Sequence, residues 1–320
     1  MKVGAAGKLM VAGEYAVALL GTPALAVATG EIVTVTQVPS NASPPTEATI
    51  TLDAFGQSWS WPMDDIPDEG LAAFIRAALY FVWQDNPPAL TKNLQVRVRA
   101  DRAGQKLGLG SSAATTVATL RAALALRGER RDALEIGRWA DEIHRSVQGG
   151  QGSGYDVYTI AMGGCCKYEP KQRHATHLDW PKGLHAVALY SGQPASTTKA
   201  LKQGISGADP RVAQIAASAT VLLENWSTAS PQRLLELLNE CEKHFEALAT
   251  SHRWLLPSAI EAIKNDIEAC GAIARVSGAG GGDCVWAWSD DPARLKALIT
   301  RRKSSLVATF PADLAIPGAL

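Results

Sequence analysis

The chain has 320 residues, with 31 basic and 31 acidic side chains and a sequence pI near 7.0. Because the net charge is zero, we expect no general attraction to nucleic acid or to a membrane surface. With 47% hydrophobic and 19% charged residues, the chain has enough apolar sequence to bury a sizeable core. This composition excludes intrinsic disorder and predicts two domains or one large one.

The sequence carries no pattern for a membrane or for secretion. Its apolar runs fall short of the roughly 18 residues that a spanning helix needs, and Met1 is not followed by a signal-peptide pattern. We therefore expect a cytoplasmic protein without a membrane partner. Five cysteines form no C-x-x-C pair, so we expect buried, reduced thiols rather than disulfides.

In chain order, the first half begins with strands and continues with helices. Alternating or β-branched residues predict four strands, at residues 31–38, 48–52, 57–61 and 94–99. A helix is predicted at 70–83, between the third and fourth of these strands. Helical patterns follow at 111–126 and 131–147, and the second ends at a glycine-rich break at 149–154.

The second half mixes strands and helices. A strand pair is predicted near 161–168 and 186–190. Three helices that begin with proline follow, at 210–226, 231–251 and 257–270. The last predicted elements are strands at 274–277 and 284–288, a helix from Pro292 and a strand from Leu306. This order indicates an α+β fold, with domains predicted at 1–180 and 181–320.

The sharpest local motif is KLGLGSSAA at 106–114, between a predicted strand and a predicted helix. Gly108 and Gly110 let the backbone approach a ligand closely, and the amides that begin the next helix favour an anion. The motif therefore indicates a phosphate-binding loop. Ser111 and Ser112 would either cap the helix or offer a hydroxyl to Mg²⁺. Taken alone, the motif fits an ordinary Gly-Ser helix entry equally well.

Two further tracts depart from ordinary strand sequence. SGAGGGDC at 277–284 has four glycines in five positions, each of which would weaken a hairpin by about 0.5–1 kcal/mol. Close approach to a ligand or to another loop would explain them. GAAGKLMVAGEYAV at 4–17 places Lys8 and Glu14 in apolar surroundings, where unpaired charges are costly. Both charges need partners or a function.

These three tracts, in this order and at this spacing, resemble the three motifs of the GHMP kinase superfamily. The resemblance covers essentially the whole chain. It implies a two-domain α+β fold, with an N-terminal domain like ribosomal protein S5 domain 2 and a ferredoxin-like C-terminal domain. It also implies an active site in the cleft between the domains, with ATP and Mg²⁺ as cofactors.

Four details are similar to the phosphomevalonate kinases of the GHMP type. They are Lys106 just before GLGSSAA, the SGAGGGDC tract, QGGQGSGYDV at 148–157 and SGQPASTTK at 191–199. The resemblance implies ATP-dependent phosphorylation of 5-phosphomevalonate to 5-diphosphomevalonate, in isoprenoid precursor synthesis. The alternatives are a mevalonate or sugar kinase, a diphosphomevalonate decarboxylase, or a ligand sensor that does not catalyse.

The resemblance also implies roles for individual residues. It makes Asp156 and Lys8 catalytic, because a carboxylate beside an ammonium orients the acceptor while the lysine offsets phosphoryl charge. The residues implied for the nucleotide are Lys106, Gly108, Leu109, Gly110, Ser111, Ser112 and Ala113. Those implied for the acceptor are Ser153, Gly154, Ser196, Thr197, Lys199, Gly280 and Gly281. Ordinary turn chemistry is the alternative for the hydroxyls at 196–198.

The predicted Mg²⁺ ligands differ from those of the related mevalonate kinases, in which a helix glutamate before the catalytic aspartate binds Mg²⁺. The corresponding residue here is Arg145. Glu142 is therefore predicted as a ligand together with Ser111 and Ser112, with Asp141 as an alternative. The remaining possibility is one protein hydroxyl with waters and phosphates.

Other conspicuous residues receive structural predictions. Trp59 and Trp61, like Trp286 and Trp288, are two residues apart on strands, and we expect both pairs in the core. We expect Glu14 to bury its charge against Lys8 or a backbone amide. Lys106, His144 and Arg145 are further candidates for binding the acceptor phosphate. The expected partners are ATP and 5-phosphomevalonate, with no nucleic acid, and the protein is expected to be a monomer or a homodimer.

Overall fold

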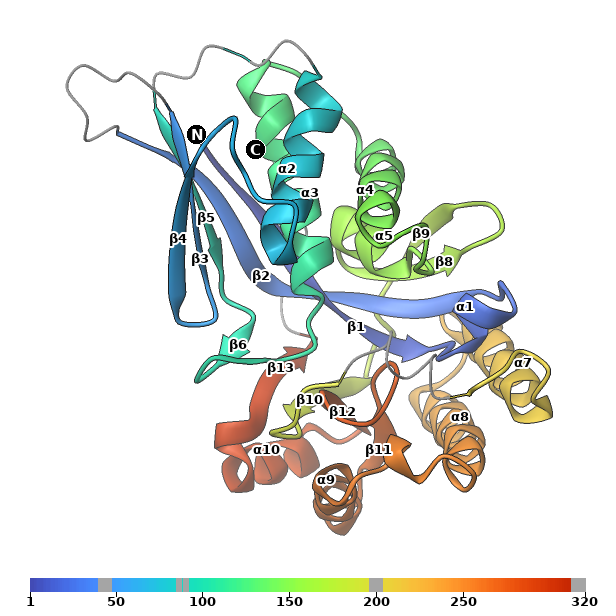
Figure 1. Cartoon of the computed structure of the whole chain (residues 1–320). Helices are drawn as coiled ribbons and strands as arrows, with labels where there is room; N and C mark the ends of the chain where they lie inside the picture. Colours follow the sequence, from blue (N-terminus) through green and yellow to red (C-terminus); the bar gives the residue numbers. More distant parts are fainter. Residues whose placement is uncertain (40–47, 85–87, 89–91, 196–203, 312–320) are drawn as a thin grey trace.

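Two main β-sheets, each covered by helices, form the framework of the described part of the chain (Figure 1). The structure is a computed structural model, and it describes residues 1–39, 48–84, 88, 92–195 and 204–311. Within these residues, the larger sheet has strand order β4-β3-β5-β2-β8-β9, with β1 paired to β2. The smaller sheet has strand order β11-β12-β10-β13. The two sheets share no strand, and the division at residues 180 and 181 stays a prediction.

The larger sheet is built from the first half of the chain. Its strands are β1 (Lys2–Ala12), β2 (Ala24–Val38), β3 (Thr49–Ala54), β4 (Gln57–Pro62), β5 (Asn93–Val98), β8 (Cys165–Glu169) and β9 (His174–Leu178). Pairing is antiparallel except between β3 and β5, which are joined through a helix, as parallel strands require. A separate two-stranded ribbon pairs β6 (Asp101–Arg102) with β7 (Gln105–Lys106).

Helices cover one face of this sheet, as Figure 1 shows. They are α2 (Gly70–Trp83), α3 (Ser111–Leu126), α4 (Ala133–Val147) and α5 (Tyr155–Met162). The central helix is α3, which packs against β1, α2, α4 and α5. Its sequence is rich in alanine and threonine, and most of these side chains are buried. Because these residues are small, all these neighbours can approach closely, and the helix is buried on nearly every side.

The smaller sheet forms the core of the second half. Its strands are β10 (His185–Tyr190), β11 (Ile273–Val276), β12 (Cys284–Ser289) and β13 (Leu306–Phe310). Numbered along the chain, they lie in the order 2-3-1-4, with helices after the first and third strands, which is the ferredoxin-like arrangement. The α+β prediction and the ferredoxin-like prediction are therefore confirmed. The segments between the helices and strands include two 3₁₀ turns, η1 (Arg253–Leu255) and η2 (Lys303–Ser305).

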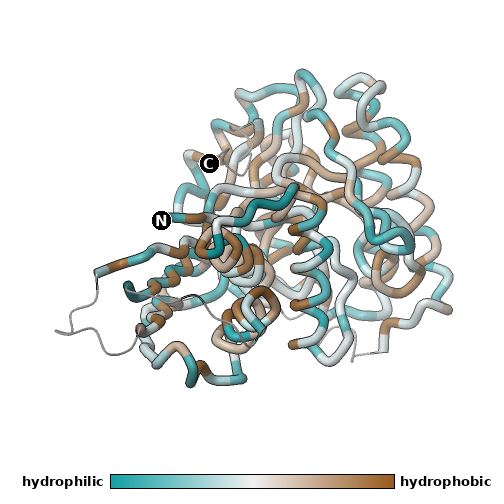
Figure 2. Tube along the Cα trace, turned by 90° about the horizontal axis from the view of Figure 1, so that it is seen from above, coloured by the Kyte–Doolittle hydropathy of each residue, from teal (hydrophilic) through white to brown (hydrophobic). Residues whose placement is uncertain are grey.

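The helices of the second half are α7 (Pro210–Asn225), α8 (Pro231–Ala249), α9 (Ser258–Ala269) and α10 (Pro292–Arg301). Asp209, Ser230 and Asp291 each accept a hydrogen bond from a first-turn amide, and a proline follows each of them. At α9 the proline, Pro257, is itself the N-cap. Figure 2 shows apolar and polar residues alternating along the helices, as expected when one face of each is buried.

Several element predictions were wrong in detail. The strand predicted from residue 161 begins at Cys165, because 155–162 form α5. β2 begins at Ala24 rather than at 31, and β9 was not predicted. Alternation of apolar and polar residues cannot identify a strand in a short apolar segment that is buried on all sides, because such a segment does not alternate.

The two tryptophan pairs differ in their surroundings. Trp286 and Trp288 are fully buried, which confirms the prediction for that pair. Trp59 is 38% exposed and Trp61 is partly buried against the core. Both lie on β4, at the edge of the larger sheet, where no further described strand covers them. The core prediction was therefore wrong for Trp59.

The first strand connects the two halves of the molecule. Ser277 Oγ and Trp286 Nε1 donate hydrogen bonds to the Met10 carbonyl, at 2.9 and 2.7 Å, and Arg275 Nε donates to the Val11 carbonyl. These donors belong to β11, β12 and the turn between them, whereas Met10 and Val11 lie on β1. The strand that carries Lys8 is therefore anchored on both sheets.

Among the described helices, none is long and apolar enough to cross a membrane.

Candidate active site

The predicted phosphate loop lies between β7 and the start of α3. Gly108 and Gly110 have φ angles of 73° and 78°, in the left-handed region that favours glycine. Gly110 is the N-cap residue of α3, and no side chain caps the first turn. The first amides of this 16-residue helix are thus left for another hydrogen-bond acceptor. Together with the helix dipole, these amides make the start of α3 a favourable place for an anion.

Lys8 binds this loop from β1. Its backbone amide donates to the Leu109 carbonyl at 2.9 Å, and its Nζ donates to the Gly108 carbonyl at 3.1 Å. The same Nζ lies 5.6 Å from the centre of the Tyr155 ring on α5. Burial alone would lower the pKa of the Lys8 ammonium. Tyr155, Asp156 and Asp283 outweigh burial and raise this pKa above its usual 10.5. The ammonium therefore stays charged across the neutral range.

Asp156 lies in the first turn of α5, next to Tyr155. Its Oδ1 accepts a hydrogen bond from the Val157 amide at 2.9 Å, and a carboxylate in this position is favoured by the helix dipole. Gly154, with φ of 90°, is the N-cap that turns the chain into this helix. The ring of the preceding residue, Tyr155, lies 5.6 Å from Lys8 Nζ, so the start of α5 lies beside the lysine. The structure thus brings the two predicted catalytic residues together.

The Gly-Ser-Gly turn before Asp156 is fixed by buried polar groups. The Ser153 carbonyl accepts hydrogen bonds from Arg145 Nη2 at 3.1 Å and from the Tyr168 hydroxyl at 2.9 Å. A Cβ on Gly154 would lie 2.7 Å from both Asp141 Oδ1 and the Tyr168 oxygen, so only glycine fits. The turn places Ser153 and Gly154 next to Asp156, and their contact with the acceptor stays a prediction. Sequence reasoning missed Tyr168.

Asp141, the alternative metal ligand, is fully committed to arginines. Its Oδ1 is 2.8 Å from Arg145 Nε, and its Oδ2 is 2.8 Å from Arg173 Nη2. The carboxylate is 1% exposed. A buried carboxylate with each oxygen in an ion pair has no free oxygen for Mg²⁺, so this position counts against Asp141 as a ligand. Arg145 holds the turn through hydrogen bonds to the Asp141 carboxylate and to the Ser153 carbonyl. These bonds account for the position of Arg145 without contact to an acceptor phosphate.

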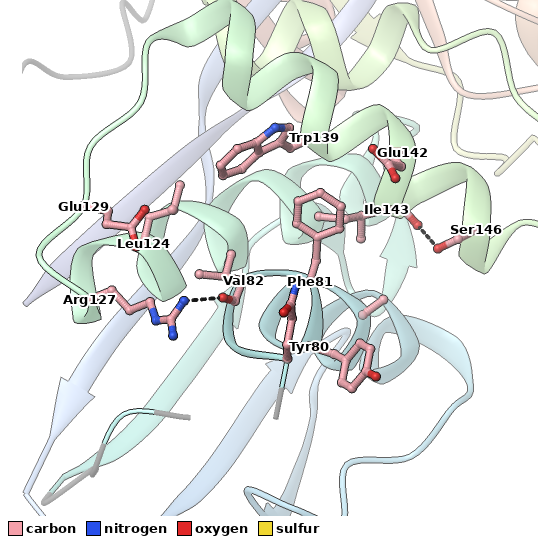
Figure 3. Close-up of a pocket in the computed structure, with 12 residues that line it drawn as sticks. Tyr80, Phe81, Val82, Leu124, Arg127, Glu129, Trp139, Glu142, Ile143 and Ser146 are labelled. Carbon is pink, nitrogen blue, oxygen red and sulfur yellow. Dashed lines mark hydrogen bonds between the residues drawn. The ribbon is translucent and has the colours of Figure 1, made fainter. Parts of the chain in front are cut away.

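Glu142 does not face the phosphate loop. The α4 residue that contacts the loop is His144, whose Nε2 lies 3.2 Å from Ser112 Oγ and whose ring stacks on Phe74 at 5.0 Å. Glu142 lies two residues earlier, which is about 200° around the helix. It lines a pocket of about 570 Å³ between α2, α3 and α4, together with Trp139 (Figure 3). Its position therefore counts against the predicted role as a metal ligand.

The two loop hydroxyls remain suitable for Mg²⁺. Ser111 and Ser112 begin α3 and are each partly exposed. Among the described residues, no group of three or more His, Cys, Asp or Glu side chains could hold a metal ion. This donor set fits a Mg²⁺ ion that takes most of its ligands from phosphate and water.

The remaining residues predicted for the nucleotide support the loop in different ways. Leu109 and Ala113 are buried and pack into the core beneath it. Lys106 is exposed, and its Nζ lies 5.1 Å from the centre of the Phe55 ring. Lys106 therefore holds a positive charge at the start of the loop.

The glycine tract at 277–284 packs mainly against other parts of the protein. A Cβ on Gly280 would lie 2.8 Å from the Leu255 carbonyl and from the Phe245 ring. The amide of Gly281 donates to the same carbonyl at 2.8 Å. Close approach to another loop therefore explains both glycines, and their positions give no support to the predicted acceptor contacts. Ser196, Thr197 and Lys199 lie outside the described residues.

Asp283, at the end of this tract, was missed by sequence reasoning. Its backbone binds the segment 191–195 twice, and its Oδ1 accepts a hydrogen bond from the Ala195 amide at 2.9 Å. A Cβ on Gly108 would lie 2.2 Å from Asp283 Cγ, so the phosphate loop packs directly against this carboxyl. Burial raises the pKa of Asp283, and Lys8 and Lys106 oppose this. The available signal was an aspartate next to three glycines.

Glu14 was expected to pair with Lys8 or with a backbone amide. Instead, its Oε2 lies 2.6 Å from Arg275 Nη2, and both side chains are almost completely buried. The pairing with Lys8 was wrong, and Arg275 was not foreseen because it is 261 residues away in the sequence. Glu14 therefore supports the strand that carries Lys8 and does not face the loop.

Two family models and a relative match the chain. Residues 73–164 match the family described as GHMP kinases N terminal domain, and residues 226–307 match GHMP kinases C terminal. A phosphomevalonate kinase from Streptomyces sp. (strain CL190) is 29% identical to the chain, covering 97% of this chain and 95% of that protein.

Solved structures show the same fold. The phosphomevalonate kinase of Streptococcus pneumoniae, in complex with phosphomevalonate and AMPPNP, matches with a TM-score of 0.80 and 20% identity, covering 97% of this chain and 99% of that one. The mevalonate kinase of Methanococcus jannaschii matches with a TM-score of 0.76 and 17% identity, covering 97% and 96%. The two family matches together span more than half of the residues. The chain therefore belongs to the GHMP kinase family.

Proposed function

We propose that the protein transfers the γ-phosphoryl group of ATP to the phosphate of 5-phosphomevalonate, giving 5-diphosphomevalonate and ADP. One observation carries the proposal: Lys8 joins the phosphate loop, through the Gly108 carbonyl, to the helix start that bears Asp156. A kinase needs these parts, a phosphate cradle, a fixed cation and an acceptor-orienting carboxylate, at one place. The choice of acceptor is supported by the likeness to the Streptomyces phosphomevalonate kinase.

The proposed reaction is a displacement at phosphorus. An oxygen of the acceptor phosphate forms a bond to the γ-phosphorus, and the bond to the β–γ bridging oxygen breaks, leaving ADP. The acceptor phosphate is largely ionised at neutral pH, so it needs little proton abstraction. The chain's contribution is to hold the reacting oxygens in line and to offset their charge.

Individual residues fit these tasks. The Lys8 ammonium, kept charged by nearby acids, offsets negative charge on the transferring group. Asp156 orients the acceptor from the start of α5, and the α3 amides bind the nucleotide phosphates. Ser111 and Ser112 would hold Mg²⁺, which would neutralise phosphate charge when bound. The acceptor and ATP would lie between the domains proposed at 1–180 and 181–320.

A coupled assay of ADP release tests the proposal. The purified chain is given ATP, Mg²⁺ and one acceptor at a time: 5-phosphomevalonate, mevalonate, diphosphomevalonate or a sugar. We expect turnover with 5-phosphomevalonate alone, and its loss in Asp156→Asn. Turnover with mevalonate or a sugar would replace the acceptor, and CO₂ release from diphosphomevalonate would indicate the decarboxylase. Binding of ATP without turnover on any acceptor would contradict the kinase and favour a sensor.

A further inference from the structure

His144 brings an imidazole from α4 to the phosphate loop. Its Nε2 lies 3.2 Å from Ser112 Oγ, in the first turn of α3. His144 is 4% exposed, and its ring stacks on Phe74 of α2 with 5.0 Å between the ring centres. Such burial counts against the predicted direct contact between His144 and an acceptor phosphate. The ring is instead held between two helices, with one nitrogen at a hydroxyl of the loop.

The Ser112 hydroxyl needs a partner to have a fixed direction. The backbone of Ser112 is held in α3, where its carbonyl accepts a hydrogen bond from Thr116 Oγ1 at 3.0 Å. The side chain is only partly buried, and a serine side chain can adopt three staggered rotamers. The hydrogen bond to His144 selects one of these rotamers. The direction of a loop hydroxyl is thus set by a residue of another helix.

The position of the hydroxyl hydrogen decides what the oxygen can bind. A serine hydroxyl has one hydrogen and two lone pairs, and a neutral imidazole nitrogen either donates or accepts. When the Ser112 hydrogen points at Nε2, both lone pairs of Oγ stay free for a cation. Mg²⁺ takes few ligands from protein when it is bound with phosphates and water, so the orientation of one hydroxyl matters. Partners that orient a metal ligand in this way control metal affinity in many proteins.

We propose that His144 is a positioning residue that accepts the Ser112 hydrogen and thereby directs the Ser112 oxygen at the Mg²⁺ of a bound nucleotide. This inference rests on the nucleotide of the proposed function and needs no particular acceptor. His144 acts through Ser112 and is not itself a ligand, since its Nε2 is taken by the hydroxyl. Loss of this nitrogen should therefore weaken the binding of nucleotide with Mg²⁺ more than the binding of nucleotide alone.

Three variants separate positioning from general damage. His144→Phe keeps an aromatic ring beside Phe74 but removes the nitrogen, and His144→Leu makes the same test if the phenylalanine variant does not fold. His144→Gln offers an amide oxygen that can accept the Ser112 hydrogen. His244→Phe is the matched control, because it makes the same exchange on α8, where the buried His244 Nδ1 has no hydrogen-bond partner among the described residues.

Calorimetric titration with AMPPNP, once with Mg²⁺ and once in EDTA, measures the two affinities without turnover. Mg²⁺ should tighten the binding of AMPPNP to the wild type. In His144→Phe the Kd with Mg²⁺ should rise by about two- to tenfold, as the loss of a neutral hydrogen bond predicts, while the Kd in EDTA stays unchanged. His144→Gln should keep most of the Mg²⁺ effect, and His244→Phe should keep all of it.

A double variant tests whether His144 acts through Ser112. Ser112→Ala removes the hydroxyl itself and should lose at least as much Mg²⁺-dependent affinity as His144→Phe. The double variant His144→Phe with Ser112→Ala should bind no worse than Ser112→Ala alone, because the nitrogen has no further effect once the hydroxyl is gone. Additive losses in the double variant would contradict the positioning role.

The remaining outcomes separate this inference from the proposed function. Unchanged Kd values in His144→Phe, or an equal rise with and without Mg²⁺, would overturn the role of His144 and leave the kinase proposal intact. The same holds if His144→Gln binds no better than His144→Phe. Because no acceptor is present, the test stands even if another acceptor replaces 5-phosphomevalonate. A wild type that binds no AMPPNP under either condition would overturn this role together with the proposed kinase.

Discussion

Arg275 Nη2 lies 2.6 Å from Glu14 Oε2 at the place where the smaller sheet meets β1, and both side chains are about 1% exposed or less. Glu242 Oε2 lies 3.7 Å from the other guanidinium nitrogen, so one arginine serves two carboxylates. Burial raises the pKa of Glu14, and the Arg275 charge opposes this. The pair therefore joins the strand that carries Lys8 to the second half of the molecule.

Removing Arg275 should destabilise the protein strongly. Arg275→Met leaves Glu14 buried without its partner, and breaking such a pair costs about 3–5 kcal/mol in the free energy of unfolding. Urea denaturation measures this loss. Adding Glu14→Gln should restore part of the stability, because the uncompensated charge is then gone.

The control for this prediction is Arg233→Met. Arg233 pairs with Glu236 at 2.8 Å on the surface of α8, with both side chains more than half exposed. An exposed pair of this kind contributes about 0–1 kcal/mol. Equal losses in Arg275→Met and Arg233→Met would contradict the structural role of the buried pair.

Lys8 and Asp156 should be needed for the chemical step. Lys8→Met and Asp156→Asn should each lower kcat by on the order of 10², because charge stabilisation or acceptor orientation is lost. Lys2→Met, at the exposed start of the same strand, is the matched control and should keep full activity. Steady-state ADP release measures all three, and full activity of Lys8→Met would exclude the proposed mechanism.

Gly108 should tolerate no side chain. Gly108→Ala forces alanine into φ of 73° and places its Cβ 2.2 Å from Asp283 Cγ. Gly128→Ala is the control, because Gly128 has φ of 72° but nothing within 4 Å of an added Cβ. The control should lose about 1–2 kcal/mol through the left-handed backbone alone. Gly108→Ala should lose more and should also weaken ATP binding, and equal stability losses would show that Asp283 moves aside freely.

The thiols should react at a single position. Cys165, Cys166, Cys241 and Cys284 are buried, and burial raises the pKa of each, for Cys166 to about 12. The thiolate is the reactive form, so these four should be inert in the folded protein. Cys270 is only partly buried. Titration with a disulfide reagent should therefore detect Cys270 alone, and Cys270→Ser should abolish the native signal.

Asp209 should contribute a pH-dependent part of the stability. Its carboxylate caps α7 by accepting from the Arg211 amide at 2.9 Å, and hydrogen bonds from the Arg211 side chain hold its pKa below the usual 3.8. A lowered pKa in the folded state means that this stabilisation is present above pH 3.8 and is lost as the pH falls through the folded value.

The matching experiment compares Asp209→Ala with Asp209→Asn by urea denaturation. Near neutral pH, the alanine variant should lose about 1 kcal/mol, whereas asparagine keeps a capping oxygen and should lose less. The difference between wild type and the alanine variant should shrink as the pH falls below about 4. A difference that stayed constant on acidification would show that the charge of Asp209 contributes nothing.

The candidate site divides into parts that the sequence revealed and parts that it did not. The phosphate loop was predictable because two glycines and a helix start are neighbours in the chain. Lys8 was conspicuous as a charge in an apolar strand. Glu142 was placed by counting along a helix, but the side of α4 that faces Ser112 depends on how α4 packs against α2 and α3.

By itself, the sequence determined the order of most helices and strands, the α+β class and the three glycine tracts, because these depend on local backbone preferences and periodicity. Only the tertiary structure decided that Glu14 pairs with Arg275, 261 residues away, and that Asp283 fills the space beside Gly108. Such contacts join segments with no relation in sequence. Which charge meets which partner is set by the packing of the two sheets, not by any local pattern.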